Sequence, residues 1–253
     1  MLTVLALAAA AAAADWPAVR ASKTDFRAFE AGLALVGEVQ PRLFPGGVDL
    51  IDAALYDGGW VYLYSNRSDY AFPKLRRWKG YQVYRVRHVP PLPPELQWGG
   101  CRGGGGAPSV TRSFEGRAPE KFFECAPLTT FVAVQKRKKK PSAYTTRESY
   151  LATIVHEAAH QAVRGGRDHP PDYDDLIPLV DRLVPVSSDL GSRSLDEAYA
   201  QWCELSVAAE RFPRHFAAMR DDYVPGWEEP HNLGMKAVND LWDARHPPAA
   251  RRR

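Results

Sequence analysis

Two histidines and a glutamate stand in the chain at a spacing that suits metal chemistry. They are His156, Glu157 and His160, in the sequence His-Glu-Ala-Ala-His. On an α-helix, residues four apart lie one turn apart on the same face, so the two imidazoles can converge on one tetrahedral Zn²⁺. Glu157 lies about 100° round the helix, where it can reach a water at the metal without binding the metal itself. That position suits a general base.

The residues around this motif predict that its helix is buried. Apart from the motif, every residue from Thr153 to Val163 is uncharged, and two histidines and a glutamate in a protein core need polar partners. A metal ion would be one such partner, whereas the alternative is a core helix whose histidines hydrogen-bond to the backbone. A capping-box pattern over Thr145–Glu148 predicts where the helix begins, and Gly165-Gly166 predicts where it ends.

A catalytic zinc site needs a third protein ligand beside the two histidines. The longer motif, with Gly three and His six residues beyond the second histidine, is absent because those positions hold Val163 and Gly166. The best candidate further along the chain is Glu197. It is followed by Ala198 and Ala200, whose small side chains would let a second helix pack closely against the first.

Other acidic residues near Glu197 are weaker candidates for the third ligand. On a helix, Asp196 would point about 100° away from Glu197, and Glu204 would lie two turns further along, roughly 10 Å away. Glu204 and then Asp196 are the alternatives if Glu197 is not the ligand. Ser194 and Glu197 also have the spacing of a capping box, which would give Glu197 a structural role instead.

These two segments together resemble the gluzincin clan of zinc metallopeptidases, to which thermolysin belongs. The resemblance rests on His156–His160 and on Glu197-Ala-Tyr-Ala-Gln201, because the third zinc ligand of that clan is a helix-borne glutamate. The wider context is most similar to uncharacterised secreted bacterial families with a His-Glu-x-x-His-Gln helix and a later Glu-Gly-x-Ala helix. Two positions depart from these patterns. Gln201 stands where thermolysin-like enzymes have an aspartate that orients a zinc histidine, and Ala198 replaces the glycine.

The resemblance implies a zinc-dependent hydrolase that cleaves peptide bonds in a peptide or protein substrate. Its metal ligands would be the two motif histidines and Glu197, and its general base would be Glu157. The oxyanion needs a donor beside the metal. In the resembling enzymes a His or Tyr from a later helix supplies it, so we expect His231, with Tyr199 and Tyr223 as alternatives. A catalytically weak or inactive zinc-bearing binding protein on the same fold is the competing interpretation, and the intact Glu157 argues against it.

The composition limits what the rest of the protein can be. The chain has 253 residues, 45% of them hydrophobic, and we expect residues 15–253 to form a single domain. Its 33 basic and 30 acidic residues give a net charge of +3, which indicates neither nucleic-acid nor membrane-surface binding. The basic run at residues 135–140 is interpreted as a solvated loop. In an oxidising compartment Cys101 could pair with Cys125, leaving Cys203 as a buried thiol.

Residues 1–14 have the features of a secretory signal peptide. The segment is apolar except for Thr3, is too short to span a bilayer, and ends in small residues before Asp15. We therefore expect cleavage after Ala14 and a secreted or periplasmic protein of a bacterium. Every other apolar stretch is also too short to cross a membrane, so stable membrane insertion is not expected.

The chain in order predicts one early helix, then strands, then helices. The early helix covers Thr24–Leu43, and four strand-like runs follow it, with a hairpin signal at Asp57-Gly-Gly: Val48–Tyr56, Trp60–Ser65, Tyr81–His88 and Phe131–Gln135. The Pro- and Gly-rich residues 90–107 indicate a loop. After the motif helix, a short helical turn and three helices are expected: Leu176–Leu183, Leu195–Phe212, Phe216–Asp222 and Asn232–Arg245. This order predicts an α+β fold. The resemblance implies a zincin-like version of it, with an N-terminal mixed β-sheet lobe and a helical C-terminal lobe.

Overall fold

The computed structural model describes residues 23–48, 51–57, 60–66, 74–87, 100–103, 129–133, 146–164 and 171–247. Over these residues the protein is a mixed α+β structure, which confirms the predicted fold class. The predicted signal peptide, the basic run at 135–140, Cys125 and Gly165-Gly166 lie outside the described residues. No helix among the described residues is long and apolar enough to cross a membrane.

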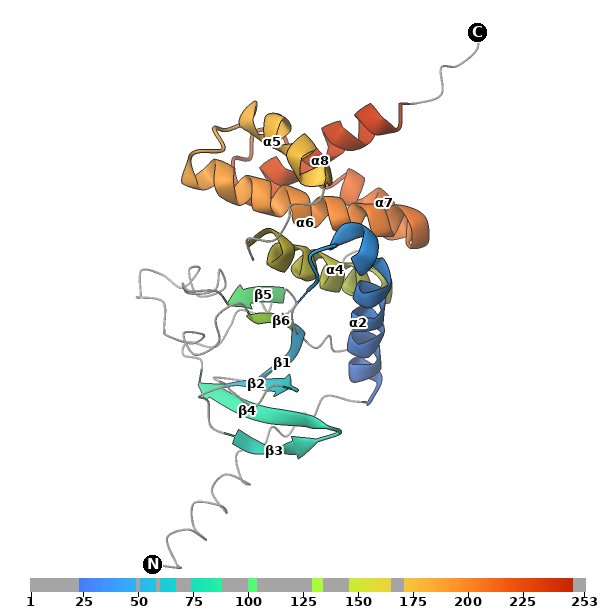
Figure 1. Ribbon diagram of the computed structural model, residues 1–253, viewed down its shortest axis with the longest axis vertical. Helices are drawn as coiled ribbons and strands as arrows, with labels where there is room; N and C mark the ends of the chain where they lie inside the picture. The colour runs from blue at the N-terminus through green and yellow to red at the C-terminus, as the bar shows by residue number, and fades with distance from the viewer. Residues whose placement is uncertain are drawn as a thin grey trace, which may run out of the picture. The chain divides into compact units, whose positions relative to one another are not determined.

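The chain divides into two compact units (Figure 1). The first comprises Met1–Phe29 and Leu50–Arg137 and contains the sheet; the second comprises Glu30–Asp49 and Lys138–Arg253 and contains the later helices and residues 30–43 of the early helix. The single domain expected over residues 15–253 stays a prediction.

The first unit contains a six-stranded sheet with the strand order β3-β4-β2-β1-β6-β5. β1 and β6 run parallel and the other neighbours run antiparallel, so the sheet is mixed, as expected. Asp57 pairs with Trp60, which confirms the predicted hairpin between β1 and β2. The strands are β1 Ile51–Asp57, β2 Trp60–Ser65, β3 Lys74–Trp78, β4 Tyr81–Arg87, β5 Gly100–Gly103 and β6 Thr129–Ala133.

Two of these strands are not predicted by the sequence patterns. The expectation of a loop over residues 90–107 is wrong for Gly100–Gly103, which pairs with β6 as the sheet's second edge. β3 is joined to β4 by Lys79 and Gly80, whose φ angles are 48° and 90°. Positive φ at both central residues is the geometry of a tight two-residue hairpin turn, and Lys-Gly is a weaker signal for it than Asn-Gly or Asp-Gly.

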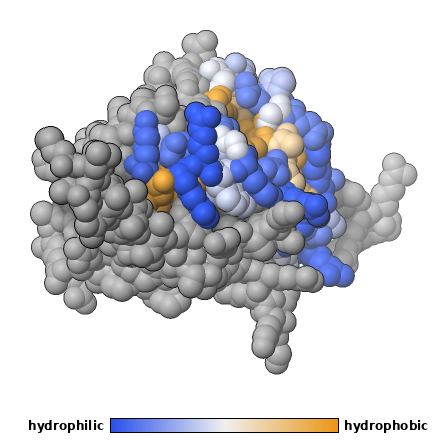
Figure 2. Space-filling model, turned by 90° about the horizontal axis from the view of Figure 1, so that it is seen from below, coloured by the Kyte–Doolittle hydropathy of each residue, from blue (hydrophilic) through white to orange (hydrophobic). Residues whose placement is uncertain are grey.

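β3 forms an edge of the sheet and is strongly basic. Lys74, Arg76 and Arg77 are all exposed. Charged side chains on an edge strand discourage pairing with another chain. On the face of the molecule seen in Figure 2, hydrophilic residues likewise predominate among the described residues.

The second unit is built around α6 (Asp189–Arg211), which packs against α4 (Arg147–Arg164), α5 (Pro171–Asp181), α7 (Pro213–Arg220) and α8 (Pro230–Arg245). In Figure 1 α6 runs between α4 on one side and α5 and α8 on the other. Because it has neighbours on both sides, α6 is buried over most of its circumference. Cys203 at its centre is a buried free thiol, as expected.

The early helix is α2 (Lys23–Leu43), which confirms the prediction for Thr24–Leu43.

The beginning of α4 differs by one residue from the predicted capping box. The helix starts at Arg147, and the hydroxyl oxygen of Thr146 accepts a hydrogen bond from the backbone N–H of Ser149 over 3.1 Å. Thr146 is therefore the N-cap, and the box predicted over Thr145–Glu148 is wrong in register. The Ser149 hydroxyl donates back to the Thr146 carbonyl over 2.9 Å.

The beginning of α6 differs more. The helix begins at Asp189, six residues before the start expected at Leu195, and Ser188 caps it by accepting the N–H of Gly191 over 3.0 Å. Ser194 therefore lies inside the helix, where its hydroxyl donates to the Leu190 carbonyl over 2.8 Å. The capping box proposed for Ser194 and Glu197 is wrong, which leaves the Glu197 side chain available for another role. Similarly, the turn expected near Leu176 is a full helix, α5.

Candidate metal centre

The histidines of α4 and the glutamate of α6 meet in the interior of the helical unit. His156 and His160 lie one turn apart, and their Nε2 atoms are 3.1 Å from each other. Glu197 places one carboxylate oxygen 3.5 Å from the Nε2 atom of His156 and the other 3.8 Å from that of His160. The structure thus brings together the three side chains that the sequence predicted as ligands. Their role as ligands stays a prediction.

The spacing of these atoms fits a metal ion of the size of zinc. Ligand atoms held at 2.0–2.1 Å round a tetrahedral ion stand about 3.3–3.4 Å from one another. The two Nε2 atoms are 3.1 Å apart, and they lie 3.5 and 3.8 Å from the two different carboxylate oxygens of Glu197; one ligand atom from each residue lies within 4.8 Å of the others. Two imidazole nitrogens and one carboxylate oxygen also form a ligand set typical of catalytic zinc sites. Zinc itself remains a prediction, because the same set can hold other divalent metals.

A carboxylate stands behind each histidine. His156 donates from Nδ1 to Glu204 Oε2 over 3.0 Å, and the Nδ1 atom of His160 lies 3.2 Å from Asp196 Oδ1. These partners favour a proton on each Nδ1, so that in the neutral rings the two Nε2 lone pairs face each other. Two lone pairs 3.1 Å apart repel unless a proton or a metal cation lies between them. This arrangement is the strongest structural argument for a bound cation.

The charges of the cluster support the same conclusion. Burial would lower the pKa of His156, but hydrogen bonds to Glu197 and Glu204 outweigh it and raise the pKa well above its ordinary value. Burial opposes the charged form of His160 too, and the charge of Asp196 raises its pKa. For Glu197 burial would raise the pKa, yet the neighbouring histidines hold it well below its usual range. The site therefore attracts positive charge.

Glu157, the predicted general base, lies on α4 beside the two histidines and is only 7% exposed. Burial raises the pKa of its carboxyl group, while the electrostatic influence of His160 and His156 lowers it by less. A carboxylate with a raised pKa binds a proton more readily than a solvated one, which suits proton transfer near neutral pH. The position and environment of Glu157 are therefore compatible with the predicted role.

His231, the predicted oxyanion donor, lies beside Glu197. It occupies the first turn of α8, and its Nδ1 atom is 3.6 Å from Glu197 Oε2. Its Nε2 atom is 3.5 Å from Asp222 Oδ2. Burial would lower the pKa of His231, but Asp222 and Glu197 together raise it to about 9. The half-exposed ring therefore carries a proton at neutral pH and faces solvent beside the cluster.

Of the alternatives named for these roles, Tyr199 and Gln201 have other hydrogen-bond partners, and Tyr223 stays an alternative. The buried Tyr199 donates its hydroxyl to the Leu43 carbonyl over 2.6 Å, so it is not an oxyanion donor. Tyr223 is half-buried in the connection between α7 and α8. Gln201 does not orient a zinc histidine, because its amide donates to the His231 carbonyl over 2.8 Å. That orienting role falls to the carboxylates described above.

The sequence does not predict the contacts that three residues make in this region. Glu204 is close to the site, but as the partner of His156 and not as a metal ligand; its place two turns after Glu197 on α6 is a signal that it shares that face. His215 contacts Glu204 from α7, with 2.8 Å between Nε2 and Oε1. Asp222 contacts His231. No spacing within one helix predicts these last two contacts.

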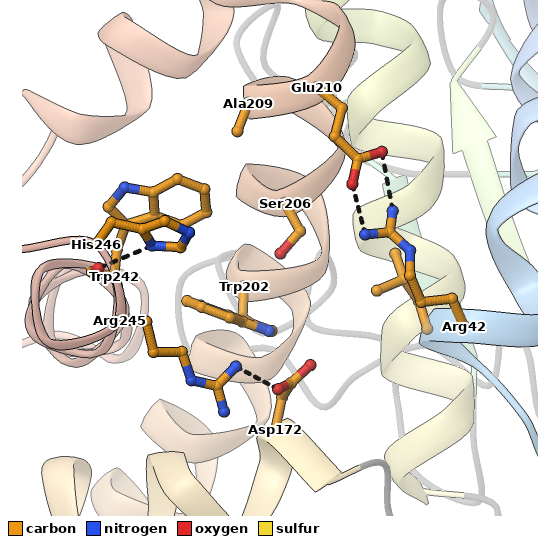
Figure 3. A pocket seen from close by; sticks show the side chains of 10 residues that line it. Arg42, Asp172, Trp202, Ser206, Ala209, Glu210, Trp242, Arg245 and His246 are labelled. Atoms are coloured by element: carbon orange, nitrogen blue, oxygen red, sulfur yellow. Dashed lines mark hydrogen bonds and ion pairs between the residues drawn. The ribbon is translucent and has the colours of Figure 1, made fainter.

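A separate cavity of about 560 Å³ lies on the opposite face of α6, where Trp202 contributes to its lining (Figure 3). Its charged groups are already paired, as Arg245 donates to Asp172 and lies over the Trp202 ring. His246 stacks on Trp242 at a ring distance of 4.1 Å. Among the described residues, the acidic and histidine side chains placed to hold one metal ion are His156, His160 and Glu197, so the cluster on α4 and α6 is the candidate functional site.

No known protein family, curated protein or solved structure matches the chain. The candidate site therefore depends on its own geometry and chemistry. These are a convergent His-His-Glu set, a buried carboxylate beside it and a protonated histidine at its margin.

Proposed function

We propose that this protein is an exported, zinc-dependent hydrolase of peptide bonds with a zincin-like fold. The observation that carries the proposal is the convergence of His156 Nε2, His160 Nε2 and the Glu197 carboxylate on one point. Glu157 is buried beside that point. A structural metal site would need neither a further buried carboxylate nor a partly exposed cation at its edge, whereas hydrolysis uses both.

The roles of the side chains follow from where they lie. His156, His160 and Glu197 would hold the ion, and the carboxylates behind the histidines keep each Nε2 lone pair directed toward it. Bound there, zinc supplies Lewis acidity, which acidifies water and polarises a carbonyl group. Glu157 accepts the proton of the attacking water and can later pass it to the leaving amine.

His231 is placed to assist the carbonyl oxygen of the substrate. Asp222 and Glu197 raise its pKa to about 9, and its contacts with Glu197 and Asp222, at 3.6 and 3.5 Å, are longer than good hydrogen bonds. Its N–H groups are therefore not fully committed to those carboxylates. A positively charged donor beside a developing oxyanion stabilises the transition state more than the ground state.

Metal content and hydrolysis, measured together, test this proposal. We expect the purified full-length protein to contain close to one zinc per chain. It should cleave casein or a mixed peptide library, lose that activity to a chelator and recover it with added zinc. A protein that binds zinc and cleaves nothing would support the alternative, a zinc-bearing binding protein. A protein that binds no metal would refute the proposal.

The Glu157→Gln variant tests the chemistry separately from the scaffold. It keeps the shape of the side chain but removes the basic carboxylate, so zinc content and thermal stability should stay close to those of the wild type. Hydrolysis should fall by about 10²–10⁴-fold, the usual contribution of a general base. Glu148→Gln is a matched control, because Glu148 is exposed in the first turn of the same helix. Near-normal turnover by Glu157→Gln would show that another group activates the water.

A further inference from the structure

A buried histidine lies one step behind the metal cluster, on a helix that supplies no ligand. His215 of α7 is only 3% exposed, and its Nε2 atom is 2.8 Å from Glu204 Oε1. The other oxygen of the same carboxylate accepts the Nδ1–H of His156 over 3.0 Å. One carboxylate thus joins a residue of α7 to a metal-facing residue of α4, through α6.

The burial of this imidazole needs an explanation. α7 has eight residues, and among them His215 and Met219 are the buried ones. Burying a polar ring is costly unless it is hydrogen-bonded, so an apolar side chain would fill the same space at a lower cost. The Nδ1 atom of His215 is buried without a hydrogen-bond partner among the described residues. A proton on Nδ1 would be left unpaired, so the geometry places it on Nε2, which donates to Glu204.

We propose that His215 is a positioning residue for the metal site, an inference that depends on the proposed metal binding. With one oxygen held by His215, the Glu204 carboxylate cannot rotate away from His156. It therefore fixes the orientation of the His156 ring and keeps the Nε2 lone pair directed at the metal. His215 does not touch the metal or a substrate.

Groups that orient metal-bound histidines have a typical effect on metal affinity, and it gives the magnitude expected for His215. Loss of a group that orients a metal-bound histidine weakens metal affinity by about 10–100-fold. Without His215, the free Glu204 oxygen would be left buried and unpaired or would turn toward solvent. In either case the hydrogen bond to His156 would lose its fixed direction, and the metal would bind less tightly.

The test is zinc affinity, measured by competition with a coloured chelator at fixed pH on the full-length protein. His215→Leu keeps most of the volume and removes the donor, and we expect its affinity to fall by about 10–100-fold. The visible spectrum of the cobalt-substituted protein should also change, since it reports ligand geometry. Met219→Ala is the control: it removes buried apolar volume one turn further along α7, so it should reduce stability and leave zinc affinity and the cobalt spectrum unchanged.

Two amide variants test the role of His215 if the His215→Leu variant does not fold. The amide nitrogen of glutamine can occupy the place of the imidazole Nε2, whereas that of asparagine is closer to the place of Nδ1. His215→Gln should therefore retain zinc affinity, and His215→Asn should lose it. Equal affinities for these two variants, or wild-type affinity in a folded His215→Leu, would overturn the role of His215 alone. Failure of the wild-type protein to bind zinc would overturn the proposed function as well.

Discussion

The crossing of α6 and α8 yields a prediction that connects packing to the site. Gly234 of α8 is buried against α6, and a Cβ added there would lie 2.8 Å from the backbone nitrogen of Ala198 and 3.1 Å from the carbonyl oxygen of Ser194. It would also lie 2.7 Å from Gln201 Oε1. The first two atoms belong to a helix backbone and cannot turn aside. Gly234→Ala therefore has to push the helices apart.

The expected free energy follows from two opposing contributions. Replacing Gly by Ala inside a helix favours folding by about 1 kcal/mol, because it reduces the freedom of the unfolded chain. Overpacking a core typically costs 1–3 kcal/mol, and contact with backbone atoms puts this site near the upper end. The net loss should be about 2 kcal/mol. For a chain of this size that corresponds to a fall in the melting temperature of about 4–8 °C.

Thermal unfolding followed by circular dichroism checks this value, with Gly37→Ala as the matched control. Gly37 is an exposed helical residue of α2 with no atom within 4 Å of an added Cβ, so Ala there should raise stability by about 0.5–1 kcal/mol. Because α8 carries His231 in its first turn, Gly234→Ala should also reduce hydrolysis. A Gly234→Ala protein as stable as Gly37→Ala would refute the close packing of α6 and α8.

Three other expectations can be measured on the same protein. Tyr199→Phe removes the buried hydroxyl that donates to the Leu43 carbonyl and should cost about 1–2 kcal/mol in a urea titration; an unchanged unfolding midpoint would contradict it. Adding zinc to the metal-free protein at about 100 times its Kd should add about 2.7 kcal/mol of stability, visible as a higher melting temperature. Mass spectrometry of the exported protein should find Asp15 as the first residue, and recovery of only the intact Met1 form from the cytosol would argue against export.

The part of the site that lies on one helix can be predicted from the sequence because a helix converts spacing into direction. His156 and His160 must share a face wherever α4 packs, so the first two metal-facing groups follow from the sequence alone. Glu197 is found by residue type and by its small neighbours. By contrast, the partnership of Glu204 with His215 depends on how α7 returns to α6, and no local pattern encodes that.

The misplaced start of α6 has a specific physical cause. Glycine normally lowers the expectation of a helix, and Gly191 stands just before the predicted start. In the structure a Cβ at Gly191 would lie 2.0 Å from the Pro185 carbonyl oxygen. The glycine is therefore present because the preceding turn folds back onto the first turn of the helix. The sequence shows the glycine but not the contact that requires it.

Close helix packing and charged residues depend on one another in the helical unit. Glu197 can reach both histidines of α4, at 3.5 and 3.8 Å, only because α4 and α6 lie close together. Close helices leave little room for water, so the carboxylates and imidazoles between them must satisfy one another. Without a proton or a metal ion between them, two histidine lone pairs would remain opposed at 3.1 Å. The packing that creates the site thus also makes a bound cation the simplest way to stabilise it.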